Sequence, residues 1–121
     1  MLTSYKELIV WQKSFVVSKM IYQATSGFPK SEVYGLASQM RRAAVSIPSN
    51  IAEGYTRAHR QEYIQFVRTA FASGAELETQ LLLAKELGFL SLKVFSEIND
   101  LLTEVQKMLN KLINSLIHPK P

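Results

Sequence analysis

The stretch that most constrains the fold covers residues 28–54, FPKSEVYGLASQMRRAAVSIPSNIAEG. Apolar or small residues recur through it in alternating steps of four and three, which is typical of a helix packed lengthwise against other helices. These residues are Val33, Ala37, Met40, Ala44, Ile47, Ile51 and Gly54. Pro48 interrupts the pattern, because its ring removes one backbone donor and costs about 3 kcal/mol in a regular helix. Since the pattern continues to Ile51, we expect a kinked helix rather than a break.

The start of this central helix is indicated by a turn signal. Pro29 disfavours helical geometry at Phe28, so an earlier helix is expected to end by Gly27. Ser31 is a good N-cap, and Glu32 in the first turn suits the helix dipole. The sequence therefore predicts a new helix with Ser31 as its N-cap.

A first helix is predicted over residues 4–26, with Ser4 or Thr3 as its N-cap and Glu7 completing a capping box. We expect its large apolar and aromatic side chains to form the inner face. They are Leu8, Trp11, Phe15, Val16, Met20 and Tyr22. Residues 8–11 are apolar on every side of the helix, which indicates that this end also meets another subunit.

Two further helices are predicted in the second half of the chain. Residues 60–87 repeat the spacing of four and three. Gly74 lies inside this helix, where glycine costs about 1 kcal/mol relative to alanine, so it indicates a close helix crossing. Gly88 is expected to end the third helix, and Ser91 to cap a fourth that runs to residue 117. A second apolar stripe on the fourth helix offers more surface for another subunit: Val94, Leu101 and Met108.

Four helices with short connections predict an all-α fold, an antiparallel up-down-up-down four-helix bundle formed by residues 1–121 as a single domain. The chain has no cysteine, which excludes disulfides and thiolate metal sites and is typical of a reducing compartment. It has no apolar run long enough to span a bilayer, and its start does not resemble a signal peptide. We therefore expect a cytoplasmic protein.

Catalytic chemistry finds little support in the sequence. His59 is expected in a loop and His118 near the end of the chain, and neither has an assignable serine or acid partner. A di-metal site in a bundle needs paired Glu-x-x-His motifs from two helices, whereas His59 and Glu62 supply one reversed fragment. We predict no catalytic residue, no cofactor and no metal site.

A set of charged and polar residues flanks the apolar seams of the second and third helices. It consists of Arg42, Asn50, Glu53, Glu76 and Glu78. Charges beside an apolar seam are costly unless they are paired. We predict an Arg–Glu network that fixes the register of the two helices; a carboxylate active site is the alternative.

Basic residues exceed acidic ones, giving a formal net charge of +4, and the excess lies in the first half of the chain. We predict that five of them contact nucleic acid: Lys30, Arg41, Arg57, Arg60 and Arg68. Tyrosines are interleaved with them, and arginines beside exposed aromatic rings can hold phosphates and stack bases without sequence preference. The alternative is that the tyrosines rim the core and the charges only solvate the surface.

Three phrases of the sequence carry a resemblance to a known family. They are FPKSE at residues 28–32, YGLASQMRRAAVSIPSNIAEGY at residues 34–55 and SGAELETQL at residues 73–81. In order and spacing they resemble the 23S rRNA intervening-sequence protein family, and the resemblance extends over residues 4–116. The chain departs from the family pattern at Thr56 and His59, where the family usually has a glycine and a serine.

The resemblance implies a bacterial four-helix-bundle protein that is similar to the accessory variability determinant of diversity-generating retroelements. That relative is a pentamer of bundles that binds nucleic acid and a reverse transcriptase. The implied partners are other copies of the chain in a homopentamer, RNA or DNA, and a protein such as a reverse transcriptase. The residues of the expected Arg–Glu network fall on motif positions of the family.

These patterns favour a non-enzymatic, oligomeric four-helix bundle that binds nucleic acid through basic surfaces or acts as an accessory scaffold. A purely structural protein–protein interaction module with no nucleic-acid role is the alternative. An enzyme that uses the Arg–Glu set is a third.

Overall fold

The structure of the protein, a computed structural model, describes residues 3–57 and 59–120. This part of the chain contains four α-helices and no strand, which confirms the predicted all-α class. The helices are α1 (Ile9–Thr25), α2 (Leu36–Thr56), α3 (Arg60–Glu86) and α4 (Leu92–Ile117), with short 3-10 helices η1 (Tyr5–Glu7) before α1 and η2 (Lys30–Glu32) before α2.

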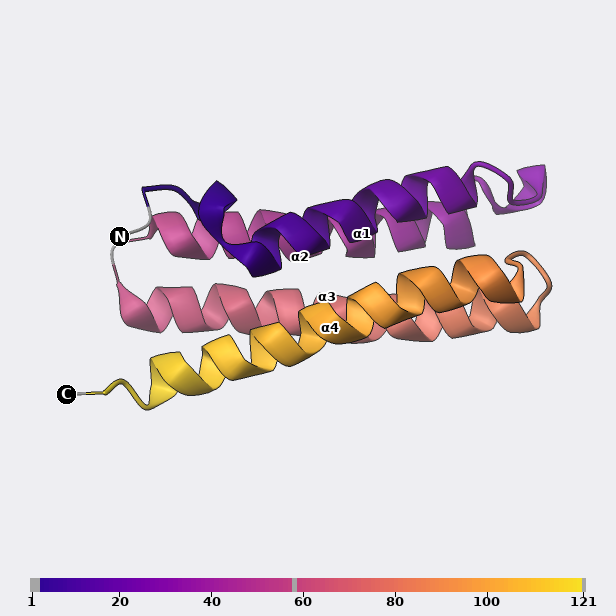
Figure 1. Ribbon diagram of the computed structural model, residues 1–121. Helices are drawn as coiled ribbons and strands as arrows, with labels where there is room; N and C mark the ends of the chain where they lie inside the picture. The colour runs from indigo at the N-terminus through magenta and orange to yellow at the C-terminus, as the bar shows by residue number, and fades with distance from the viewer. Residues whose placement is uncertain (1–2, 58, 121) are drawn as a thin grey trace.

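The four helices lie side by side around one apolar core (Figure 1). α1 packs against α2 and α4, and α3 packs against the same two helices. Figure 1 shows the end of α2, the start of α3 and the end of α4 at one end of the bundle, which we call the α2–α3 end. The end of α1 and the start of α2 lie at the opposite end. This arrangement is consistent with a four-helix bundle.

The predicted seam of α2 forms the centre of the core. From Ala37 to Gly54 every predicted seam position is buried, and Met40, Ala44, Ile47 and Ile51 are completely enclosed. Val33 is the exception, with an exposed fraction of 49%. The spacing of four and three therefore identified the buried face of α2 but extended it one turn too far.

The predicted start of α2 is wrong, because the helix begins at Leu36 and not after Ser31. Lys30–Glu32 form η2, and Gly35 occupies the N-cap position of α2. Glu32 supplies the capping contact, since its Oε1 accepts a hydrogen bond from the backbone N–H of Leu36 at 3.3 Å. A glutamate that reaches forward by four residues replaces the serine cap that the sequence suggested.

Pro48 lies inside α2 without ending it, as predicted. Because proline has no N–H, the carbonyl of Ala44 loses its partner within the helix. Ser18 of α1 replaces that partner, since its Oγ donates to the Ala44 oxygen at 2.9 Å. The hydrogen bond is buried and joins α1 to α2 at the position of the proline.

The first helix begins later than predicted. Ser4 does act as a cap, but for η1, where its Oγ accepts from the N–H of Lys6 at 3.1 Å. The Glu7 carboxylate accepts from the Thr3 hydroxyl at 2.6 Å. Leu8 then has extended backbone angles, so α1 starts at Ile9.

The predicted inner face of α1 is only partly correct, because Leu8, Trp11 and Met20 pack against the core whereas the other three predicted residues are exposed. Phe15, Val16 and Tyr22 are 43–47% exposed. The buried face is made by a different set of residues: Val10, Ser14, Val17, Ser18, Ile21 and Thr25. Three of its members are polar, but each hydroxyl donates to a carbonyl of α1 itself, so no donor is left without a partner. Half of the buried face of α1 is therefore polar, so hydrophobicity alone does not identify it.

Three features predicted for α3 and α4 are confirmed: the close crossing at Gly74, the stop at Gly88 and the cap at Ser91. A Cβ atom at Gly74 would lie 2.0 Å from the Oε1 of Gln106, so α4 crosses α3 closely at this glycine. Gly88 adopts a positive φ of 78° and ends α3, which favours glycine. Ser91 caps α4 by accepting a hydrogen bond from the N–H of Val94 at 3.1 Å.

Candidate nucleic-acid interface

The five basic residues predicted to contact nucleic acid do not form one surface. Arg57, Arg60 and Arg68 lie at the α2–α3 end, whereas Lys30 lies in η2 at the opposite end. Arg41 belongs to the first half of α2 and packs against α1. The five residues are spread out because α2 separates the two ends of the bundle by about 30 Å, at 1.5 Å per residue.

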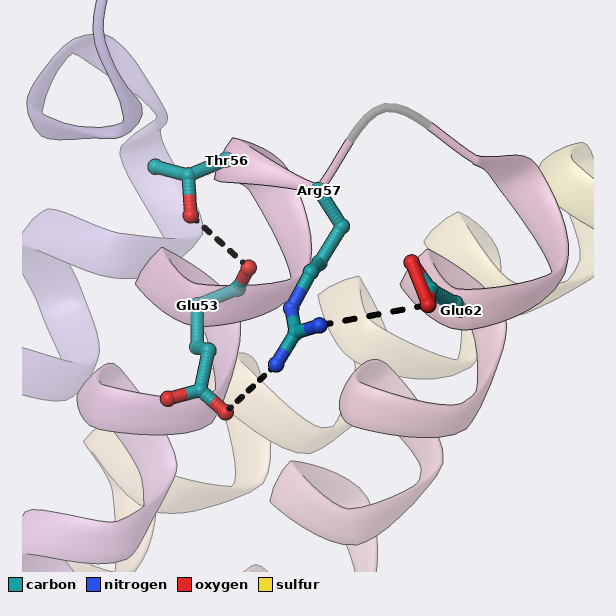
Figure 2. A network of polar contacts seen from close by, with 4 residues as sticks. All are labelled: Glu53, Thr56, Arg57 and Glu62. Carbon is teal, nitrogen blue, oxygen red and sulfur yellow. Dashed lines mark hydrogen bonds and ion pairs between the residues drawn. The ribbon is translucent and has the colours of Figure 1, made fainter.

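Arg57 is held between two carboxylates (Figure 2). Its Nη2 lies 3.8 Å from Glu53, and its Nη1 lies 3.9 Å from Glu62. Its guanidinium also lies over the ring of Phe66, with 5.1 Å between Cζ and the ring centroid. The two acids offset part of the positive charge that Arg57 was predicted to offer to a phosphate.

The same region contains the two departures from the family pattern. Thr56, the last residue of α2, donates its hydroxyl to the carbonyl of Glu53 at 2.9 Å (Figure 2). His59 occupies the N-cap position of α3, but its side chain makes no capping hydrogen bond. Of these two residues, only Thr56 makes a side-chain hydrogen bond to a helix end, at the end of α2.

Arg60 and Arg68 line a groove of about 370 Å³ between the start of α3 and the end of α4. Ile64, Leu116 and Ile117 contribute its apolar part, and no acidic side chain of the described residues lines it. Neither arginine makes an ion pair within the described part of the chain. Both guanidinium groups are thus available to an anion.

Arg41 is fixed by neutral partners. Its Nε donates to the Oγ1 of Thr25 at 2.8 Å, and its Nη2 donates to the carbonyl of Tyr22 at 3.4 Å. Its Cζ lies 4.7 Å from the centroid of the Tyr22 ring. Thr25 is buried, and its hydroxyl donates a hydrogen bond to the carbonyl of Ile21 at 2.6 Å. The guanidinium therefore keeps its full charge in a fixed orientation.

Beside Arg41 lies a hollow of about 580 Å³, which we call the Tyr34 hollow. It is lined by Tyr22, Val33, Tyr34, Ser38, Arg41, Arg42, Val45 and Ser46. Two of these residues are arginines and none is acidic. The Tyr34 side chain stands out from the turn before α2, with an exposed fraction of 97%.

The structure brings Arg42 and Glu76 together without joining them. Both line a small hollow of about 210 Å³ between α2 and α3, but no ion pair connects Arg42 to a glutamate among the described residues. Arg42 is exposed and therefore needs no partner to offset its desolvation. The Glu76 carboxylate instead accepts from the Gln80 amide at 3.2 Å, and Glu53 faces Arg57. Within one chain, the expected Arg–Glu contact is thus absent, and Glu78 is half-buried on α3 without an ion pair in the described part.

The polar link between α2 and α3 is made by Ser46, Ser73 and Asn50 rather than by the arginine and glutamates of the expected network. The hydroxyls of Ser46 and Ser73 lie 2.8 Å apart. Asn50, a member of the expected network, donates its amide to the Ser46 hydroxyl at 2.9 Å and to the Ser46 carbonyl at 2.8 Å. The spacing of Ser46 and Asn50 by four residues, beside the α2 seam, is the signal that could have predicted this contact.

Tyr63 lies at the α2–α3 end, partly buried against the core. Burial raises the pKa of Tyr63 above its usual value of 10.0, and the nearby Tyr55 raises it further. The two rings meet edge to face with their centroids 6.1 Å apart. Across the described residues, no three His, Cys, Asp or Glu side chains are grouped so that they could hold a metal ion. No described helix combines the length and apolar character that a membrane crossing requires.

This geometry defines an all-α protein of four packed helices with arginines in open grooves on its surface. Residues 6–111 match the family described as 23S rRNA-intervening sequence protein, so the chain belongs to that family. A crystal structure of a protein with unknown function from the S23 ribosomal protein family of Bacteroides thetaiotaomicron has a similar fold, with a TM-score of 0.81 and 23% sequence identity. The similarity covers 90% of this chain and 98% of that one. No curated protein matches the sequence.

Proposed function

We propose that the protein is a non-enzymatic, antiparallel up-down-up-down bundle that self-associates and binds nucleic acid in the cytoplasm. The observation that carries the proposal is the Tyr34 hollow, where Arg41 and Arg42 stand beside two tyrosine rings with no acidic residue in the described lining. Guanidinium groups hold phosphates well because their planar fork matches two oxygens at once. The groove that contains Arg60 and Arg68 supplies a second set of unpaired cations.

Self-association is supported by apolar surface on the side of α1 that faces α4. Ile9 is 58% exposed and Val16 is 43% exposed. A groove of about 540 Å³ lies between the start of α1 and the end of α4, and Ile9, Met108 and Leu112 line it. Another subunit that covered this groove would remove apolar surface from water. The homopentamer implied by the family resemblance is the assembly that we propose.

Assembly matters for binding because a single chain with a net charge of +4 is a weak ligand for a polyanion. Several copies in one ring would present the same arginines repeatedly, and the second contact would benefit from a high effective concentration. The proposal therefore predicts binding that tolerates many sequences and depends strongly on salt.

A titration of labelled RNA and DNA with the full-length chain at about 50 and about 200 mM salt tests this function. We expect binding at the lower concentration and a steep loss at the higher one. Light scattering on the same samples should give a mass several times that of one chain. A monomer that binds neither RNA nor DNA at low salt would overturn the proposal.

A protein-interaction module with no nucleic-acid role is the second candidate. It is favoured by exposed leucines where α3 leads into α4: Leu83, Leu87 and Leu92 are 48%, 54% and 69% exposed. The partner implied by the resemblance is a reverse transcriptase. Copurification of a co-expressed reverse transcriptase with the wild-type chain, and its loss with Leu87→Ser and Leu92→Ser together, would favour this candidate.

A further inference from the structure

Tyr34 is almost fully exposed, and the binding of phosphates by arginines does not explain why an aromatic ring stands there. A phenol ring that is 97% exposed gains no burial energy in the folded chain. Its backbone is nevertheless fixed, because the N–H of Val33 donates to the Lys30 carbonyl at 3.2 Å and the N–H of Gly35 donates to the Glu32 carbonyl at 3.1 Å. The ring is therefore presented to solvent from an ordered turn at the edge of a hollow.

The cations beside this ring are arranged for an anion. Arg41 uses its Nε and Nη2 on Thr25 and Tyr22, and its Nη1 has no partner among the described residues. Arg42 has no hydrogen bond or ion pair within the described chain and projects into the same hollow. Two guanidinium groups with free N–H donors and one free aromatic face are thus combined in one place.

We propose that the Tyr34 hollow binds an unpaired nucleotide of a single-stranded nucleic acid, with its base stacked on Tyr34 and its phosphate held by Arg41 and Arg42. The inference rests on the proposed nucleic-acid function and specifies the state of the strand. Each base has a flat π-face, so stacking on tyrosine tolerates any sequence. The Ser38 hydroxyl, which also lines the hollow, can donate to or accept from a base edge or a sugar.

A duplex fits this site less well. In a duplex the base faces are covered by neighbouring base pairs, so a protein reaches the phosphates, the sugars and the groove edges of the bases but not their faces. The arginines would still engage the phosphates, but the Tyr34 ring would gain no partner. The chemistry of the site therefore predicts a preference for single strands that depends on one aromatic ring.

An acidic peptide is the other ligand that two arginines could attract. Its carboxylates would satisfy the guanidinium groups, but an acidic side chain has no flat ring to cover Tyr34. The pairing of cation and exposed ring in one hollow therefore favours a nucleotide. Poly-glutamate serves as the probe for this alternative.

The test uses fluorescence anisotropy with a labelled single-stranded RNA and a duplex of the same sequence, measured with the full-length chain at low salt. We expect the wild type to bind the single strand more tightly than the duplex. Tyr34→Ala should weaken single-strand binding by about tenfold, the size of a lost base–aromatic stack, and leave duplex binding unchanged. Tyr34→Phe, which keeps the ring, should bind both probes as the wild type does.

Arg68→Ala is the comparison for a phosphate contact outside the hollow, and it should weaken both probes equally. Light scattering and thermal melting of each variant separate a loss of binding from a loss of assembly or folding. Equal binding of single strand and duplex by the wild type, or equal losses on both probes in Tyr34→Ala, would overturn the inference and leave the proposed function standing. Displacement of RNA by poly-glutamate that is as effective in the wild type as in Tyr34→Ala would overturn it in favour of an acidic partner. Failure of the wild type to bind either probe would instead overturn the proposed function.

Discussion

Two places in the bundle combine an arginine with aromatic rings, and they differ in what surrounds the arginine. At the α2–α3 end, Arg57 lies over Phe66 but stands between Glu53 and Glu62. In the Tyr34 hollow, Arg41 lies over Tyr22 and is fixed by a hydroxyl and a carbonyl that carry no charge. The first arrangement offsets part of the positive charge within the chain, whereas the second orients the cation and places no acid beside it.

The tyrosines of the two places differ in the same sense. Tyr63 at the α2–α3 end is half-buried against the core, next to Tyr55. Tyr34 has almost its whole side chain in solvent. A composition of arginine and tyrosine therefore does not by itself identify a binding surface, because the charge and exposure of the neighbours decide what remains for a ligand.

The difference between the two places is tested most directly by removing the arginines from each place in turn. We expect Arg41→Ala with Arg42→Ala to lower the affinity for RNA by about 100-fold, equivalent to about 2.7 kcal/mol, since two charge-assisted contacts are lost. Arg57→Ala should lower it by no more than about threefold, because its charge is already offset. Anisotropy titrations at one salt concentration measure both. Equal losses from the two changes would mean that the carboxylates beside Arg57 do not shield it.

Thermal melting of the single variant Arg42→Ala accompanies this experiment. An exposed arginine without an ion pair should contribute less than about 0.5 kcal/mol to the free energy of unfolding. An arginine paired with a buried carboxylate would contribute about 3–5 kcal/mol. A large drop in stability would therefore show that the Arg–Glu contact expected from the sequence forms between subunits.

The next prediction concerns the wall of the Tyr34 hollow, which depends on the alignment of α1 with α2. Ser18→Ala should lower the free energy of unfolding by about 1–2 kcal/mol, because the Ala44 carbonyl beside Pro48 loses its buried donor. Urea unfolding measures the change. Ser14→Ala is the matched control: its hydroxyl is also buried but donates to the Trp11 carbonyl, a position where the helix supplies a backbone donor.

A double-mutant cycle sharpens the same argument. In Pro48→Ala the backbone N–H is restored, so the Ala44 carbonyl gains a partner within α2. Ser18→Ala should then cost less in that background than in the wild type. An equal cost in both backgrounds would show that Ser18 stabilises the protein in another way.

A smaller effect is expected when the shield of Arg57 is removed. Glu53→Gln with Glu62→Gln should raise the affinity for RNA by about threefold and steepen the salt dependence by about one released counterion. The control is Glu97→Gln with Asp100→Asn on α4, which changes the net charge equally at a place away from Arg57. The same gain in both double variants would mean that net charge alone controls binding.

These contrasts also explain which features of the fold and of the candidate site could be predicted from the sequence. The α2 seam, the tolerance of Pro48, and the stop and cap at Gly88 and Ser91 depend on spacing within one helix or on steric rules for one residue type, and the cost of Gly74 inside a helix signals its close crossing. Such rules act before the helices are assembled, so the sequence predicted these features correctly.

The face of α1 could not be predicted in the same way. Buried Ser14, Ser18 and Thr25 satisfy their hydroxyls within α1, so hydrophobicity points to the wrong stripe. Which arginines keep a free charge depends on the rotation of each helix about its axis and on rotamers of residues far apart in sequence. Arg42 and Arg57 both lie near the α2 seam, yet of these two only Arg57 forms ion pairs within the described residues.

The smallest expected effect concerns the buried tyrosine of the α2–α3 end and tests the comparison through pH. Burial holds the pKa of Tyr63 above its usual value of 10.0, so the folded state keeps the phenol proton at a pH where the unfolded state releases it. The stabilisation is complete below pH 10.0 and declines as the pH rises through the folded pKa, because the unfolded state then binds fewer protons. Urea unfolding at a series of alkaline pH values should therefore give a steeper loss of stability for the wild type than for Tyr63→Phe. Tyr34→Phe, with its ring in solvent, is the control and should follow the wild-type curve. Parallel curves for the wild type and Tyr63→Phe would show that Tyr63 reaches water as freely as Tyr34 does, and the distinction between the two places would then rest on the carboxylates alone.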